Sequence, residues 1–100
     1  MAEARIVPEG DACLRLEGEL SFATVPGLEQ RGAEMLRRCA DEVVVDLAGV
    51  RRADSAGLAL LVAWLRHARR QGRRLRFRRM PAQMRAMARV SDLEGVLPLE

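Results

Sequence analysis

Hydrophobic periodicity switches repeatedly between a spacing of two and a spacing of three to four along this 100-residue chain, and this switching most constrains its fold. Apolar and polar residues alternate over 12–17, 43–47 and 74–78, which predicts three strands that each bury one face. A weaker alternation predicts short strands near 6–7 and 96–97. The spacing becomes helical in three further segments, and these are 25–39, 58–68 and 80–88.

The expected order is therefore strand, strand, helix, strand, helix, strand, helix. Strand–helix–strand connections favour parallel pairing with right-handed crossovers, which places the helices on the same side of the sheet. Strands that are covered on both faces would be apolar throughout, and these strands alternate. We therefore expect an α/β fold of two layers, in which helices cover mainly one face of a mixed, mostly parallel sheet. The length fits a single domain over residues 1–100.

Composition excludes several other classes of protein. An apolar fraction of 49% with a net charge of +3 is not typical of a disordered chain. The longest apolar stretch, 56–65, is well short of the roughly 20 residues that a membrane span needs. No basic region leads into an apolar one near the start, so we expect a cytoplasmic protein. Cys13 and Cys39, with the one histidine His67, cannot supply a zinc site, and we expect no metal, cofactor or disulfide.

The charge is distributed unevenly along the chain. All 17 basic residues are arginine, and ten of them lie between Arg66 and Arg89, a window without any acidic residue. The window could be a solvated surface or could face a partner, such as an acidic protein surface or anionic lipid headgroups. Nucleic acid is disfavoured because Phe77, the one aromatic residue in the window, is expected to face the core and offers no base a stacking platform.

The turn at 46–58 joins a strand to the middle helix and carries most of the functional information. Asp54 or Ser55 could cap this helix, as Thr24 could cap the helix before it. Gly57 in the first turn lowers the stability of the helix by about 1 kcal/mol relative to alanine. A glycine kept there in spite of this cost predicts that the backbone closely approaches a strand or a partner. A hydroxyl at a helix N-terminus lies in positive potential, where a phosphate or a partner's carboxylate is favoured. Ser55 could equally be only a cap.

This turn resembles the signature of STAS domains, the sulfate transporter and anti-sigma-factor antagonist family. Residues 54–61 read DSAGLALL and follow VVDL at 44–47. The resemblance extends over nearly the whole chain and implies the STAS fold, a mixed sheet with helices stacked on it. In anti-sigma factor antagonists of this family, the residue at the position of Ser55 is the regulatory phosphosite.

Two groups of STAS proteins compete. Antagonists usually carry a second serine and a further glycine in this motif, where this chain has Ala56 and Ala59. The motif, with WLR at 64–66 and PAQM at 81–84, is more similar to MlaB, the cytoplasmic STAS subunit of the Mla phospholipid ABC transporter. That resemblance implies a non-catalytic protein that binds the ATPase subunit, in a complex with a permease and a lipid-binding subunit that maintains outer-membrane lipid asymmetry. The alternative is an anti-sigma factor antagonist regulated by phosphorylation of Ser55.

The middle helix suggests where such a partner would bind. Leu60 and Trp64 lie opposite the expected core stripe, and we expect them to face outward as anchors for a partner. Trp64 could instead pack on a neighbouring helix. We expect a chain that is monomeric when isolated and has no enzymatic activity, because no nucleophile–base pair or phosphate loop is evident. The predicted partner-binding residues are Asp54, Ser55, Gly57, Leu60 and Trp64.

Overall fold

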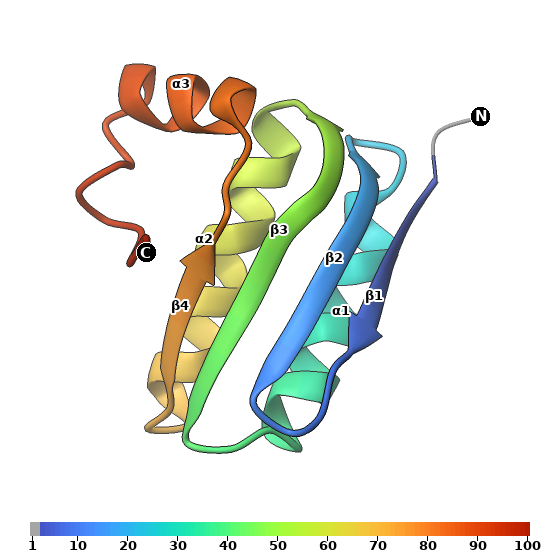
Figure 1. Ribbon diagram of the computed structural model, residues 1–100, viewed down its shortest axis with the longest axis vertical. Coiled ribbons are helices and arrows are strands. Elements are labelled where there is room, and N and C mark those ends of the chain that lie inside the picture. The colour runs from blue at the N-terminus through green and yellow to red at the C-terminus, as the bar shows by residue number, and fades with distance from the viewer. Residues whose placement is uncertain (1–2) are drawn as a thin grey trace.

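A computed structural model describes residues 3–100 as a four-stranded sheet with helices on one face (Figure 1). The strands lie in the order β1-β2-β3-β4; β1 is antiparallel to β2, and the other two pairings are parallel. This confirms the predicted α/β fold and the predicted order of elements. The elements are β1 (Ala4–Pro8), β2 (Cys13–Leu20), α1 (Val25–Arg37), β3 (Glu42–Ala53), α2 (Ser55–Arg70), β4 (Arg74–Arg78) and α3 (Ala82–Val90).

The central strand β3 extends well beyond the predicted 43–47. Its register against β2 shifts twice, so that β3 has two extra residues between the pair Arg15–Asp46 and the pair Glu19–Arg52. Such bulges break the period of two, because they turn successive side chains to the same face. Leu47, Val50 and Ala53 are consequently buried at a spacing of three. The sequence pattern detected only the regular first half of the strand.

The predicted strand at 96–97 is wrong. These residues lie in a turn, and the segment that follows them runs along the outer edge of β4 instead. Phe77 N donates a hydrogen bond to Pro98 O at 2.9 Å, and Glu100 N donates to Phe77 O at 2.9 Å. The end of the chain thus pairs with part of an edge strand that would otherwise leave unpaired backbone groups.

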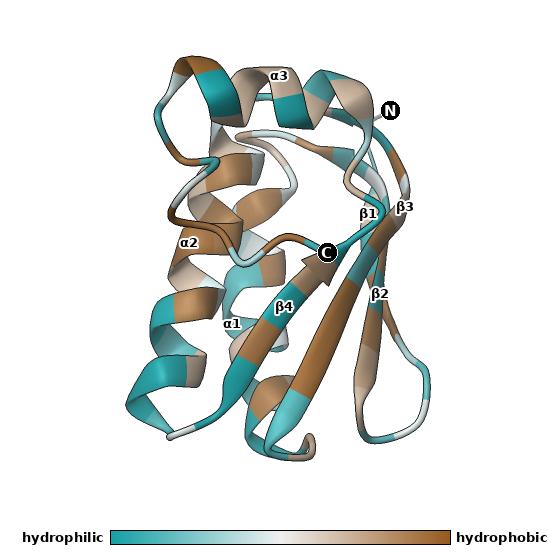
Figure 2. Cartoon of the chain, turned by 60° about the vertical axis from the view of Figure 1, so that its left-hand side comes forward, coloured by the Kyte–Doolittle hydropathy of each residue, from teal (hydrophilic) through white to brown (hydrophobic). Residues whose placement is uncertain are grey.

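Helices α1 and α2 pack side by side on one face of the sheet, and α3 lies across its upper end (Figures 1 and 2). The hydrophobic stripes predicted for the three helices face the core, with Val62, Met35 and Met87 half-buried at its margin. No helix within the described residues is both long enough and apolar enough to cross a membrane.

The expectation that Leu60 and Trp64 face outward is wrong. Both are buried, and Trp64 has no exposed surface. The Trp64 ring lies against Gly32 of α1, and its Nε1 donates a hydrogen bond to Glu29 O at 3.1 Å. A helix that packs on a sheet and also on a neighbouring helix is buried on two sides, so its apolar stripe is wider than the sheet alone requires. Trp64 therefore follows the alternative, in which it packs on a neighbouring helix.

Candidate functional site

The turn between β3 and α2 is held by Asp54, while Ser55 faces solvent. Asp54 Oδ1 accepts a hydrogen bond from Ala56 N at 2.8 Å, and Asp54 N donates to Leu20 O at 2.9 Å. Of the two caps that the sequence allowed, Asp54 is therefore the one used. Ser55 is the first residue of α2 and is exposed, and its hydroxyl forms no hydrogen bond with any group in residues 3–100. The hydroxyl is therefore available for an intermolecular contact.

Gly57 lets the first turn of α2 approach the ends of two strands. A Cβ at this position would lie 2.9 Å from Leu20 Cβ and 3.2 Å from Ala53 Cβ, both closer than ordinary contact. The sequence left open whether Gly57 approaches a strand or a partner. In the structure it approaches the ends of two strands. Because Gly57 is buried, it offers no surface of its own to a partner.

A hollow of about 520 Å³ opens beside Ser55 at the carboxyl ends of β2 and β3. Its far wall is α3, which is fixed by the side-chain amide of Gln83. Gln83 Nε2 donates to Ala53 O at 2.8 Å, and Gln83 Oε1 accepts from Ala53 N at 3.2 Å. This amide completes the backbone bonding of β3 where β4 no longer accompanies it. Met87 lines the same wall, so the hollow has an apolar side opposite the Ser55 hydroxyl.

Phe22, which no sequence pattern singled out, lies in the turn between β2 and α1 and is 75% exposed. It follows Ser21, another residue that lines the hollow. The turn is braced by Thr24, whose Oγ1 accepts from Ser21 N at 2.9 Å and donates to Glu19 O at 2.8 Å. Thr24 occupies the predicted cap position, but its hydroxyl forms no capping bond to α1. An exposed aromatic side chain beside a concave surface is typical of a protein-binding site.

The predicted partner-binding residues thus fall into two groups. Asp54 and Ser55 lie together on the rim of the hollow, and their contact with a partner stays a prediction. Gly57, Leu60 and Trp64 are inside the fold, and Leu60 and Trp64 cannot serve as the outward anchors that were expected. Met87 lines that hollow, and the exposed Phe22 is the sequence neighbour of Ser21, which also lines it.

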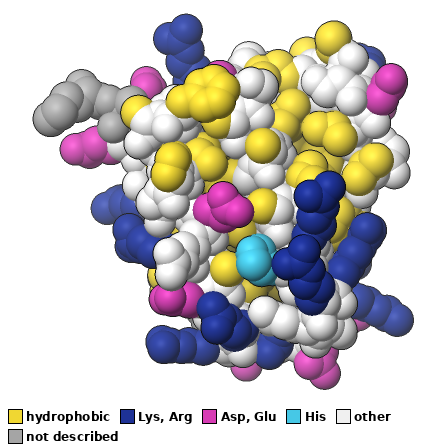
Figure 3. All heavy atoms as spheres, turned by 180° about the vertical axis from the view of Figure 1, so that it is seen from behind, with side chains coloured by type: hydrophobic (Ala, Val, Ile, Leu, Met, Phe, Trp, Pro, Cys, Tyr) yellow, Lys and Arg dark blue, Asp and Glu magenta, His cyan; other side chains and the backbone are white. Residues whose placement is uncertain are grey.

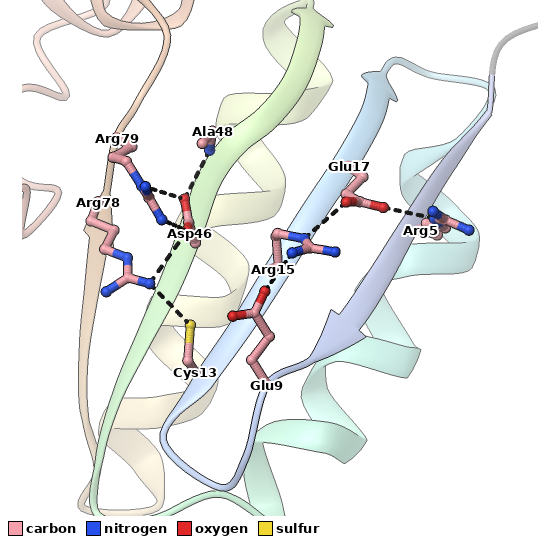
Figure 4. Close-up of polar contacts among 9 residues, drawn as sticks. All are labelled: Arg5, Glu9, Cys13, Arg15, Glu17, Asp46, Ala48, Arg78 and Arg79. Atoms are coloured by element: carbon pink, nitrogen blue, oxygen red, sulfur yellow. Dashed lines mark hydrogen bonds and ion pairs between the residues drawn. The ribbon is translucent and has the colours of Figure 1, made fainter.

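The other face of the sheet carries a buried ion cluster around Asp46, which is only 1% exposed (Figure 4). Arg78 Nη2 lies 3.3 Å from Asp46 Oδ2, Arg79 donates to both carboxylate oxygens, and Ala48 N donates to Oδ1 at 3.0 Å. Burial acts to raise the pKa of Asp46. The hydrogen bonds from Arg79 and Ala48 and the two positive charges outweigh it, so the pKa lies below its ordinary value. The carboxylate stays ionised and ties β3 to the segment that leads into α3.

Beside this cluster, a row of alternating charges runs over β1, β2 and the turn that follows β1 (Figure 4). Arg15 Nη1 lies 2.7 Å from Glu9 Oε1, and Arg5 Nε donates to Glu17 Oε1 at 2.7 Å. The hydrogen bond from Arg5, aided by the charge of Arg15, lowers the pKa of Glu17. Because these charges pair with one another, this part of the face has no strong field that would attract a charged partner.

The arginine-rich window does not form one surface. Its residues are divided between the last turns of α2, the strand β4, the helix α3 and the segments that connect them. Arginine side chains gather on the lower part of the helix-covered side, whereas hydrophobic side chains gather on the upper part (Figure 3). Each of the three helices has an arginine in its last turn, where a positive charge complements the helix dipole.

Cys13 and Cys39 are both free. Burial raises the pKa of each thiol, which disfavours the reactive thiolate.

A family model described as "Mlab, STAS domain" matches residues 7–98, which is nearly the whole chain. The chain belongs to the STAS domain family. The match includes the Ser55 turn, the hollow beside it and both strands that hold the Asp46 cluster. A sequence comparison with curated proteins gives no significant match.

Solved STAS-like structures are similar in fold. The anti-sigma factor antagonist SpoIIAA in its unphosphorylated form aligns with a TM-score of 0.76 and 13% identity, over 98% of this chain and 86% of that one. An anti-sigma factor antagonist from Mycobacterium paratuberculosis aligns with a TM-score of 0.76 and 19% identity, over 99% and 85% of the two chains. At these identities the likeness establishes the shared fold alone.

Proposed function

We propose that this STAS domain is a non-catalytic subunit that binds the ATPase subunit of an Mla-type phospholipid ABC transporter at the cytoplasmic side of the inner membrane. In this role it supports the assembly and activity of a complex with a permease and a lipid-binding subunit. The observation that carries the proposal is the exposed Ser55 hydroxyl on the rim of a hollow that also has an apolar wall. The description of the matching family and the alanines at 56 and 59 favour this partner over a sigma-factor regulator.

The docking contact combines a polar and an apolar part. Phe22 supplies an exposed aromatic anchor, and aromatic residues often dominate the energy of an interface. Ser55 supplies a hydroxyl in the positive field of the α2 N-terminus, suited to an acceptor on the partner. The buried residues Leu60 and Trp64 contribute only by holding α2 in place.

The test is co-purification of the ATPase subunit with Ser55→Asp. We expect this variant to lose binding by about tenfold or more, because it places an unneutralised carboxylate in the contact. A negative charge at a helix N-terminus stabilises the helix, so unfolding would not explain the loss. Gln30→Glu, which adds the same charge at an exposed position of α1, is the matched control and should bind normally.

Phe22→Ala is the second variant, and we expect a similar loss without a change in stability because the ring is largely exposed. If Ser55→Asp and Phe22→Ala both retain full ATPase binding, this face is not the docking site. The rival function predicts different results. An anti-sigma factor antagonist would co-purify with an anti-sigma factor, and mass spectrometry after incubation in cell extract would detect phosphate on Ser55.

A further inference from the structure

A second hollow, of about 380 Å³, lies at the other end of α2, between its last turns and the start of β4. The last turns of α2 are hydrophilic in Figure 2, in contrast to its upper turns. The floor of the hollow is apolar and includes the buried side chains of Leu65 and Leu75. Glu42 is the one carboxylate in its lining. The other charged lining residues are arginines, and these are Arg69, Arg73, Arg74 and Arg76.

One of these arginines is fixed in place, while the others form only long ion pairs or none within residues 3–100. Arg73 donates to Arg37 O at 2.8 Å and to Ala40 O at 3.2 Å, which anchors its guanidinium across the end of α1. Arg74 reaches Glu42 only at 3.5 Å, between side chains that are 83% and 68% exposed. Exposed pairs of this kind stabilise a protein by about 1 kcal/mol at most, so an incoming anion can replace them at low cost.

Arg69 and Arg76 are also available. Arg69 forms no ion pair within residues 3–100, and Arg76 reaches Glu100 Oε1 only at 3.7 Å. The two side chains come from different elements, α2 and β4, yet line the same hollow.

Stabilisation of the α2 C-terminus does not explain this cluster. The carbonyls of His67, Ala68 and Arg69 already accept hydrogen bonds from the backbone N–H groups of residues 71–73. An arginine in the last turn of a helix complements the helix dipole, which accounts for Arg69. It does not account for Arg74 and Arg76, which belong to a strand. A cluster of guanidinium groups over an apolar floor is better suited to an anion that carries a carbon moiety.

We propose that this hollow binds a phosphoryl group attached to a carbon moiety. A guanidinium can donate two parallel hydrogen bonds to phosphate oxygens, and several arginines together can neutralise a dianion. The carbon part of the ligand would lie on Leu65 and Leu75. A soluble phosphomonoester and a phospholipid headgroup both have this chemistry. The site is separated from Ser55 by the length of α2, about 24 Å for 16 residues, so it does not depend on the docking proposal.

The experiment has two arms. Glycerol 3-phosphate is titrated into the full chain while backbone amide resonances are followed, and vesicles of phosphatidylcholine with or without phosphatidic acid are tested by co-sedimentation. We expect chemical shift changes concentrated at residues 65–76. Arg69→Gln combined with Arg76→Gln should weaken binding by about tenfold or more, equivalent to the loss of about 1.4 kcal/mol. The matched control, Arg31→Gln with Arg51→Gln, removes the same charge from a different hollow, which also contains Glu3 and Glu17, and should change binding less than about twofold.

The outcomes distinguish a soluble ligand from a lipid headgroup, and some of them would overturn the proposal. Binding of glycerol 3-phosphate assigns a soluble ligand, whereas binding only to phosphatidic acid vesicles assigns a lipid headgroup, provided that only the Arg69/Arg76 variant loses it. The proposal is overturned if neither probe binds, or if the control pair weakens binding as much as the test pair. Ser55→Asp should leave phosphate binding unchanged. The docking proposal and the phosphate-binding proposal can therefore fail independently.

Discussion

On the helix-covered face of the sheet, stability depends on the fit between apolar side chains, as where the Trp64 ring lies against Gly32. On the open face, the only charged residue that is buried within residues 3–100 is Asp46, held by Arg78 and Arg79. Packing of apolar groups involves no protonation and no charge for salt to screen, whereas an ion cluster responds to both pH and ionic strength. Substitutions on the two faces should therefore differ in size and in their dependence on conditions.

The largest effect is expected for Trp64→Ala on the covered face. It removes the largest fully buried side chain and leaves a cavity between α1 and α2. We expect the free energy of unfolding to fall by about 3–5 kcal/mol, measured by urea denaturation. Trp64→Phe keeps most of the side-chain volume but loses the hydrogen bond to Glu29 O. It should therefore lower the free energy of unfolding clearly less than Trp64→Ala does. Equal losses for both variants would mean that the hydrogen bond, and not packing, dominates here.

Gly32→Ala tests the same contact from the side of α1. On propensity alone, alanine in a helix is favoured over glycine by about 1 kcal/mol. A Cβ at this position would overlap the Trp64 ring, however, and we expect a net destabilisation of about 1–3 kcal/mol by urea denaturation. The double variant Gly32→Ala with Trp64→Ala should lose less than the sum of the two single losses. Gly27→Ala, where a Cβ meets open space in the same helix, is the control and should be neutral or stabilising.

The sequence alone predicted the order of elements and most of the core, because periodicity reports which side of each element is buried. It did not predict the burial of Leu60 and Trp64, since the stripe of one helix does not show that a second helix lies beside it. Gly32 on α1 was the available signal. A glycine in the buried stripe of a helix leaves room for a large side chain on a neighbouring element.

The candidate site was predicted only in part. The turn motif pointed to Asp54 and Ser55, because capping and the helix field are local effects. Phe22 was missed because it belongs to no local pattern. Gln83 is part of the PAQM motif, but its contact with Ala53 spans 30 residues and was not foreseen. The Asp46 cluster was missed for a similar reason. Its partner Arg79 lies 33 residues away and has a left-handed backbone with φ of 55°, which no periodicity reveals.

Asp46→Asn tests the open face and should have a smaller but pH-dependent effect. In the folded protein the pKa of Asp46 lies below its ordinary value. Its ionised form therefore stabilises the fold fully above the unfolded-state pKa of about 3.9, and this contribution is lost as the pH falls through the folded-state pKa. We expect a loss of roughly 1–3 kcal/mol at neutral pH.

The measurement is urea denaturation of Asp46→Asn and wild type from neutral pH to acid pH. The difference between the two proteins should shrink as the pH falls below about 4. Glu34→Gln, an exposed carboxylate on α1, is the control and should change stability by less than about 0.5 kcal/mol. A difference that stays constant at acid pH would show that Asp46 acts through packing, as the covered face does.

The smallest effect is expected for Arg74→Gln, at the solvated margin of the open face. Its pair with Glu42 is long and exposed, so we expect a change of less than about 0.5 kcal/mol by urea denaturation, and less still in high salt. A double-mutant cycle with Glu42→Gln isolates the pair, and its coupling should be near zero. A coupling above about 1 kcal/mol would contradict this. Stability on the open face would then be spread over its exposed charges, and Asp46 would no longer be the group on which that face depends.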